Sequence, residues 1–375
     1  MIRKKFGNSN MNHARRAKND EFYTLNTDIE DELKHYRDKF KDKVVYCNCD
    51  DPTESEFYRY FHLNFHFFGM KKLITTHYDP DKPTYELIYQ GGTCEQDDNN
   101  YNSYDEKIPL KENGDFRSEE SIELLKQSDI VVTNPPFSLY QEYIKQLIDY
   151  HKKFIIIGNK NSVIGQVVFP LIMNNKLWIG INSPKEFRTP DGLTKKVSGL
   201  TRWFTNLPIK KPTDREILWN HFSQDEMPAY DNYPAFECGK VSHIPVDQEI
   251  DTWIDNNSLK GFKDFYKEDL TIKQRSTDKT LVHILRPMLG VPITFLDKYN
   301  PSSKLFPDDN MAMRFEILGE SDRQNAYGLR FKKYEKGIPK YNDLNAHCVL
   351  KTGDTYKSKY ARIFIRQRKD FKPTH

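Results

Sequence analysis

The residues whose chemistry stands out are Asn134-Pro135-Pro136-Phe137, which follow the β-branched run Ile130–Val132. A short apolar run that ends at prolines predicts a buried strand, and each proline restricts the residue before it, so Asn134 is held at the strand's end. The side-chain carbonyl of Asn134 and the backbone carbonyl of Pro135 are two acceptors for an exocyclic amine, whose nitrogen they would draw toward tetrahedral geometry. Phe137 offers a face for a planar base. The pattern therefore indicates group transfer to such an amine, and a plain Asn-Pro turn after a strand is the open alternative.

The elements needed to position this motif are those of an α/β protein. Continuous apolar runs between amphipathic segments predict a mostly parallel sheet covered on both faces, and open sheets of this kind bind ligands at the carboxyl ends of their strands. The predicted strands are Lys43–Cys49, Lys72–His77, Thr84–Tyr89, Ile130–Val132, Phe154–Asn159, Leu177–Ile181 and Leu200–Phe204. The predicted helices are Ile29–Phe40, Pro52–Phe68 with Gly69 as its C-cap, and Ser138–Tyr150. Residues 95–107 are acidic and rich in Asn, which predicts a surface loop.

Four separated segments of the chain are Lys18–Thr24, Lys43–Pro52, the Asn-Pro-Pro-Phe motif and Gly290–Pro301. Together they resemble the EcoRI-type adenine-N6 DNA methyltransferases. The motif alone is similar to the (Asp/Asn/Ser)-Pro-Pro-(Tyr/Phe/Trp) signature of amino-group methyltransferases that use S-adenosylmethionine. The resemblance covers most of residues 12–247 and resumes at 286–319, and four segments in one order are far more specific than a tetrapeptide. It implies a Rossmann-like methyltransferase fold with a mostly parallel seven-stranded sheet and a smaller C-terminal target-recognition region.

The resemblance also implies S-adenosylmethionine as cofactor and suggests residues that bind it. Tyr23 and Thr24 belong to a Phe-Tyr-Thr element that in related enzymes packs on the methionine end. Asp115 and Phe116 match an Asp-Phe pair that holds the adenine, the carboxylate accepting from the amine and the ring stacking. For Asp115, simple membership of the turn at Asn113-Gly114 is the alternative.

Three further acidic residues are cofactor candidates. Asp50 and Asp51 follow the first strand, in a loop that lacks the glycines usual at this point, and either would cap the next helix or face the cofactor's amino group. Asp79 follows the second strand, where a carboxylate would accept from ribose hydroxyls. A plain turn at Asp79-Pro80-Asp81 is the alternative.

Composition limits the class of protein. The chain of 375 residues has room for two domains, carries a net charge of only +3 and has five scattered cysteines. An odd number of cysteines without a second close pair or a His cluster indicates reduced thiols and no structural metal. No run approaches the length of a membrane span. We therefore expect a soluble, cytoplasmic monomer without an obligate protein partner.

The charge is unevenly placed, which predicts how the chain is organised. Residues 323–375 hold 14 Lys and Arg against 4 Asp and Glu, which suggests a segment facing a polyanion, with a solvated basic face as the alternative. We predict a basic arm at 1–19, a catalytic domain at 20–210 and a target-recognition region at 211–375 with an insertion at 248–285. The predicted DNA-binding residues are Lys195, Lys196, Arg202, Arg362 and Arg366, the last two on one face of a strand.

The sequence thus predicts a site-specific methyltransferase that transfers methyl from S-adenosylmethionine to N6 of a flipped adenine in duplex DNA, for restriction-modification or protection from restriction. In this reaction Asn134 and Pro135 accept from the amine, Pro136 stiffens the loop and Phe137 stacks on the base. One alternative is methyl transfer to RNA adenine or protein glutamine, since Asn-Pro-Pro-aromatic motifs serve those amines too. The other is a non-catalytic DNA-binding protein, motivated by the glycine-free loop.

Overall fold

The chain divides into two compact units in the computed structural model. The first comprises Met1–Ile172 and Lys176–Ile209, and the second comprises Met173–Asn175 and Lys210–His375. The structure describes residues 23–49, 52, 55–76, 78–79, 83–92, 104–188, 194–197, 199–211, 227–228, 230, 235–244, 288–301, 315–320, 348–352, 355–359 and 361–368.

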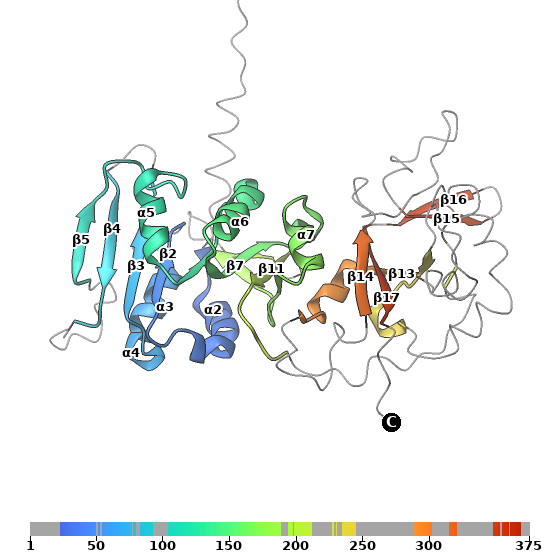
Figure 1. Ribbon diagram of the computed structural model, residues 1–375, viewed down its shortest axis with the longest axis horizontal. Helices are drawn as coiled ribbons and strands as arrows, with labels where there is room; N and C mark the ends of the chain where they lie inside the picture. Colours follow the sequence, from blue (N-terminus) through green and yellow to red (C-terminus); the bar gives the residue numbers. More distant parts are fainter. Residues whose placement is uncertain are drawn as a thin grey trace, which may run out of the picture. The chain divides into compact units, whose positions relative to one another are not determined.

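An eight-stranded sheet forms the centre of the first unit (Figure 1). Its strands in spatial order are β5 (Glu106–Pro109), β4 (Tyr85–Tyr89), β3 (Lys72–Thr76), β2 (Val44–Cys47), β6 (Ile130–Thr133), β7 (Lys153–Asn159), β11 (Thr201–Thr205) and β8 (Trp178–Ile179). The four central strands, β3, β2, β6 and β7, are parallel, and the outer pairings on both sides are antiparallel. The predicted α/β Rossmann-like fold is confirmed.

The sheet has one strand more than predicted. The additional strand is β5, which pairs with β4 and begins in a segment that the sequence predicts as a surface loop. All four of its residues are exposed, so neither face carries the apolar alternation that identifies a half-buried strand.

The order of the strands reverses between β2 and β6. From β2 the chain moves outward to β3 on one side, and from β6 it moves to β7 on the other. Strands β2 and β6 are parallel neighbours, with Tyr46 opposite Val131. Open α/β sheets bind ligands beyond the carboxyl ends of the strands at such a switch point. Asn48 directly follows β2 and Asn134 directly follows β6.

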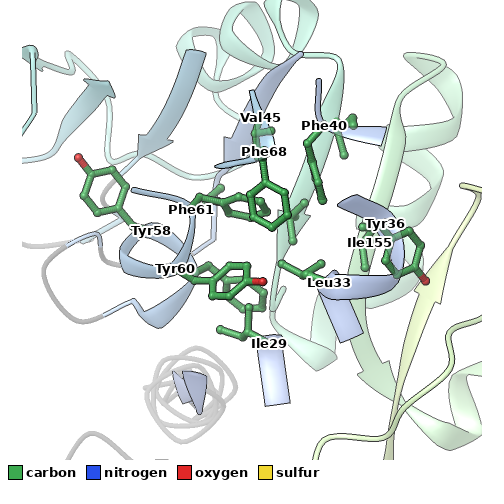
Figure 2. Close-up of a cluster of buried hydrophobic side chains, with 14 of the residues drawn as sticks. Ile29, Leu33, Tyr36, Phe40, Val45, Tyr58, Tyr60, Phe61, Phe68 and Ile155 are labelled. Carbon is green, nitrogen blue, oxygen red and sulfur yellow. The ribbon is translucent and has the colours of Figure 1, made fainter. Parts of the chain in front are cut away.

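One face of the sheet is covered by helical segments. They are α2 (Asn26–Leu33), η1 (Lys34–Lys39), α3 (Glu56–Leu63) and α4 (Phe65–Phe68). Figure 2 shows Leu33, Phe40 and Phe61 gathered in this core with Ile155 of β7. The predicted face of the first helical segment is confirmed, because Ile29, Leu33, Tyr36 and Phe40 are all 0% exposed.

The second predicted helix begins later than expected and is interrupted. Ser55 is its N-cap, with Oγ accepting from Phe57 N at 3.2 Å and from Tyr58 N at 3.5 Å. The idea that Asp50 or Asp51 caps this helix is therefore wrong. The chain bends at Asn64 between α3 and α4, and Gly69 ends α4 with a φ of 61°, as predicted.

The opposite face is covered by α5 (Glu119–Gln127), whose N-cap is Ser118, and by α6 (Tyr140–Asp149), which follows the short η2 (Phe137–Leu139). The ring of Tyr140 lies directly against the backbone of β7, where a Cβ on Gly158 would be 2.3 Å from Tyr140 Cζ. The segment after β7 forms η3 (Lys160–Ile164) and α7 (Val168–Met173). In the part of the chain that the structure describes, no helix combines the length and the apolar character needed to cross a membrane.

A small sheet beside the main one joins β1 (Tyr23–Thr24), β9 (Glu186–Arg188) and β10 (Thr194–Lys196). Acidic residues of α2 fix the segment that leads into it. Asp28 Oδ2 accepts from Lys185 N at 2.8 Å, and Glu32 accepts from Ile181 N and Asn182 N. Helix α2 thus determines where the β9–β10 hairpin begins.

The second unit contains a four-stranded and a two-stranded sheet. The larger one has the order β12 (Ala235–Glu237), β13 (Met288–Pro292), β17 (Arg362–Gln367) and β14 (Phe315–Glu320), and the smaller one pairs β15 (Cys348–Thr352) with β16 (Thr355–Lys359). Two short 3-10 helices, η5 (Val241–His243) and η7 (Ile293–Asp297), follow β12 and β13. The buried carboxylate of Glu237 on β12 pairs with Arg362 on β17 at 2.8 Å.

Candidate active site at the carboxyl edge of the sheet

The Asn-Pro-Pro-Phe motif lies at the carboxyl end of β6, where the sequence predicts it. Asn134 is 9% exposed, Pro135 is buried, and Pro136 and Phe137 are half-buried. Pro136 has extended geometry (φ −56°, ψ 123°), and its carbonyl accepts from Leu139 N as the chain enters η2. The ring centroid of Phe137 lies 6.4 Å from that of Phe187 on β9. The motif is therefore held between a buried strand, a helical turn and an aromatic partner.

Asn48 occupies the equivalent position directly after β2 and is not among the residues predicted from the sequence. Its side chain is 2% exposed, and its Oδ1 accepts from the hydroxyl of Tyr143 on α6 at 2.5 Å. Among the residues that the structure describes, its buried Nδ2 has no hydrogen-bond partner. The signal in the sequence is that Asn48 follows the apolar run Val44–Cys47 as Asn134 follows Ile130–Thr133.

The structure brings Asp79, Asp115 and Phe116 to this same edge. Asp79 N donates to Asn113 O at 3.2 Å, so the end of β3 lies beside the turn that carries Asp115. Phe116 is 4% exposed and packs edge-on against Tyr143 with 5.0 Å between ring centroids. Tyr143 therefore contacts both Asn48 and Phe116.

Asp115 is engaged within its own turn. Its Oδ1 accepts from the backbone N and the Nε of Arg117, and its Oδ2 accepts from Nη2 at 2.7 Å. Burial raises the pKa of Asp115, but the hydrogen bonds and charge of Arg117 outweigh it and hold the pKa below its usual value. The carboxylate is thus an ionised acceptor, and its proposed bond to adenine competes with Arg117.

The residues present fit the nucleoside cofactor that the sequence resemblance implies. Phe116 supplies an aromatic ring, Asp79 and Asp115 supply carboxylates, and the Nδ2 of Asn48 is a buried donor that no described residue satisfies. Buried polar groups are normally hydrogen-bonded, so this donor is accounted for if a ligand lies at the switch point.

Two further cofactor candidates, Tyr23 and Thr24, lie on β1. The backbone of Tyr23 pairs with Arg188, and Thr24 is 2% exposed, with an Oγ1 that bonds to no described residue. Asp50 and Asp51 lie outside the described residues, so their role in cofactor binding stays a prediction.

The predicted DNA-binding residues of the first unit lie in two settings. Lys195 and Lys196 are exposed on β10, where they pair with Phe187 and Glu186 of β9. Arg202 is 8% exposed on β11 and lies opposite Gly158 near the carboxyl end of β7, with Nη1 donating to Thr201 O. Its neighbour Trp203 is fully buried and packs on Phe57, so it is a core residue.

The two arginines of the second unit have internal partners. Arg362 donates to Glu237 through Nε and Nη2, and Arg366 pairs with Glu316 at 2.7 Å. The side chain of Arg362 is only 11% exposed. These ion pairs give both residues a structural role, and their contact with DNA stays a prediction.

Comparison with known proteins identifies the family of the chain. The family described as "Adenine-specific methyltransferase EcoRI" matches residues 10–254. Type II methyltransferase M.EcoRI of Escherichia coli is 37% identical over 320 residues, which cover 78% of this chain and 87% of the relative. Type II methyltransferase M.MpnI of Mycoplasma pneumoniae is 38% identical over 314 residues, or 77% of this chain and 82% of the relative. No solved structure matches the chain.

The fold and the motif at the end of β6, taken with these matches, define an adenine-specific methyltransferase. The chain belongs to the EcoRI family of these enzymes.

Proposed function

We propose that this protein transfers a methyl group from S-adenosylmethionine to N6 of an adenine flipped out of duplex DNA. The observation that carries the proposal is the position of Asn134-Pro135-Pro136-Phe137 directly after β6, beside the switch point of the sheet. The names of the relatives, Type II methyltransferases, support a place in restriction-modification.

The cofactor, when bound, supplies an electrophilic methyl group. On the target side, the Asn134 side-chain carbonyl and the Pro135 backbone carbonyl accept from the two hydrogens of the adenine amine, which localises the nitrogen lone pair for attack. Phe137 stacks on the base, and its contact with Phe187 keeps the ring in place. The enzyme's contribution is mainly positioning and fixed acceptors.

On the cofactor side, Phe116 and Asp115 hold the adenine and Asp79 accepts from the ribose hydroxyls. Tyr23, Thr24, Asp50 and Asp51 are proposed to contact the methionine end and its amino group. Asp79 follows β3 and Asn134 follows β6, which are parallel strands of one sheet, so the cofactor-side and target-side groups are proposed to share its carboxyl edge.

DNA is the proposed partner, and both units are proposed to contact it. Lys195, Lys196 and Arg202 contact DNA beside the motif in the catalytic unit. The second unit is proposed as the target-recognition region, with phosphate contacts supplying affinity and polar side chains reading base edges. The proposal places the enzyme in the cytoplasm as a monomer.

The test is methyl transfer from labelled S-adenosylmethionine to unmethylated genomic DNA, read by single-molecule modification sequencing. We expect N6-methyladenine in one sequence motif, and its loss in Asn134→Ala, while S-adenosylhomocysteine still raises the melting temperature of that variant. If methyl groups are incorporated only into RNA or into protein glutamine, that molecule is the substrate and DNA is not. Failure of the wild-type protein to bind S-adenosylhomocysteine would leave a non-catalytic DNA-binding protein.

A further inference from the structure

The feature that the proposed function leaves unused is the buried amide of Asn48. It lies immediately beyond β2, on one side of the switch point, and is 2% exposed. Its Oδ1 is the acceptor for two neighbours, Tyr143 OH at 2.5 Å and Cys49 Sγ at 3.6 Å. Its Nδ2 is buried and bonds to none of the residues described by the structure.

The oxygen of this amide faces α6. In the structure the Tyr143 hydroxyl and the Cys49 thiol both donate to Oδ1, and the NH2 group faces away from them. Burial raises the pKa of Tyr143 well above its usual value, so its hydroxyl keeps the proton that it donates. The site therefore presents a donor, which requires an acceptor on whatever lies against it.

The contacts of Tyr143 indicate which part of a ligand lies against the amide of Asn48. The same ring that donates to Asn48 packs edge-on against Phe116, 5.0 Å away, and the carbonyl of Phe116 accepts from Gln146 on the same helix at 3.0 Å. Helix α6 thus contacts both the amide of Asn48 and Phe116, the residue proposed to stack on the cofactor's adenine.

We propose that Asn48 binds the cofactor, an inference that rests on the proposed function. Its Nδ2 donates to an acceptor on the nucleoside half of the cofactor, either a ring nitrogen or a ribose oxygen. Tyr143 is a positioning residue that fixes the direction of the amide. Neither residue contacts the methyl group or the attacking amine.

The test compares two ligands that share the nucleoside, S-adenosylhomocysteine and methylthioadenosine, by isothermal titration calorimetry on the full chain. Asn48→Asp keeps the shape and the acceptor for Tyr143 but removes the donor. We expect its Kd for both ligands to rise by about tenfold, the loss expected for one hydrogen bond. Tyr143→Phe, which removes only the hydroxyl, is expected to raise the Kd for both ligands by a smaller factor.

Asn206→Asp is the matched control. The amide of Asn206 is satisfied on both sides by backbone, accepting from Phe154 N and donating to Lys152 O. The control is expected to lower the melting temperature without changing either Kd. A purely structural role for Asn48 would give the same result as this control.

The outcomes separate this inference from the function on which it rests. Unchanged Kd values in folded Asn48→Asp, with wild-type binding intact, would overturn the inference and leave the function standing. A loss confined to S-adenosylhomocysteine would also overturn it, because the donor would then face the methionine half. If Asn48→Asp does not fold, unchanged Kd values in Tyr143→Phe overturn it. Absence of wild-type binding would overturn both.

Discussion

The ring of Phe137, which ends the Asn-Pro-Pro-Phe motif, packs against the ring of Phe187, with 6.4 Å between centroids and 54° between planes. Phe187 is 1% exposed and lies on β9, opposite Lys195 of β10. The start of this strand is in turn held by the carboxylate of Asp28. The aromatic ring proposed to meet the target base therefore rests on the hairpin that carries the proposed DNA contacts.

This contact predicts that Phe187 influences catalysis without touching substrate. Phe187→Leu keeps most of the buried volume and is expected to cost about 1 kcal/mol of stability, but it removes the ring that supports Phe137. We expect kcat for methyl transfer to fall about tenfold through misplacement of the stacked base. The control is Phe40→Leu, at an equally buried ring that packs on Phe61 and Phe68. Equal losses of kcat in both variants would contradict the prediction.

Arg117 is predicted to compete with the cofactor. Its guanidinium occupies both oxygens of Asp115, and its central carbon lies 5.2 Å from the centroid of the Phe116 ring. If the adenine amine binds Asp115, it has to displace these hydrogen bonds. Because the arginine side chain is 45% exposed, the competition is modest, and we expect Arg117→Ala to bind S-adenosylhomocysteine about threefold more tightly.

The companion variant for this prediction is Asp115→Asn, which removes the charged acceptor. It should weaken binding of S-adenosylhomocysteine. Weaker binding in Arg117→Ala would show that the arginine itself contacts the ligand and does not compete with it.

Glu86 on β4 predicts a dependence of stability on pH. Its side chain is 8% exposed, and among the described residues its Oε2 has no hydrogen-bond partner. Burial raises the pKa of Glu86 above its usual value, against the opposing charge of Lys72. Between the unfolded and folded pKa values the folded protein binds more protons than the unfolded chain, so stability is highest below the unfolded pKa and falls as pH rises through the folded pKa.

The Glu86→Gln variant should lack this fall in stability with rising pH. We expect it to be more stable than the wild-type protein at neutral pH by about 1 kcal/mol. The difference in stability should be smallest at the acidic end of the pH range. Urea denaturation at a series of pH values from about 4.5 to 8 measures the difference. Parallel curves for the two proteins would refute the raised pKa.

The sequence predicted the position of the Asn-Pro-Pro-Phe motif at the end of a strand because its signals are local. A β-branched run followed by two prolines is enough to place Asn134 at a strand's end, and Gly69 identifies a helix end by its type alone. The same local reasoning failed for β5, whose exposed residues lack periodicity, and for the cap of α3, where Ser55 was overlooked beside two more obvious aspartates.

Contacts between distant residues were beyond sequence reasoning. The hydrogen bond from Tyr143 to Asn48 joins residues 95 positions apart, and the one from Ile181 to Glu32 joins residues 149 positions apart. Nothing in a helix pattern indicates that one tyrosine of α6 will reach the end of β2. The charge of Arg362 was likewise visible in the sequence, but its partner Glu237, 125 positions away, was not.

The geometry separates the predicted DNA-binding residues into two groups, and mutation should separate them too. Lys195 and Lys196 are exposed on a hairpin edge, so Lys195→Ala with Lys196→Ala should leave stability unchanged and weaken binding to duplex DNA. The slope of log affinity against log salt should become shallower by about 0.9 for each phosphate that the variant no longer neutralises. Fluorescence anisotropy with a labelled duplex across a salt series measures both quantities.

Arg362→Ala should act mainly on the fold of the second unit. Burial raises the pKa of Glu237, but the hydrogen bonds and charge of Arg362, with Tyr230 and Lys359, outweigh it and hold the pKa below its usual value. The pair therefore stabilises the fold above the unfolded pKa, and this stability is lost as pH falls through the folded pKa. Removing Arg362 leaves the buried carboxylate with only Lys359 and Tyr230 as partners among the described residues, and we expect a loss of about 3 kcal/mol at neutral pH.

A double-mutant cycle decides between the two roles of Arg362. Replacing both partners, Arg362→Leu with Glu237→Leu, should recover much of the stability that either single change loses, since no buried charge then remains. If the double variant is stable and still binds DNA with the wild-type salt slope, the arginine serves the fold. A shallower slope in the stable double variant would show that its charge also reaches a phosphate.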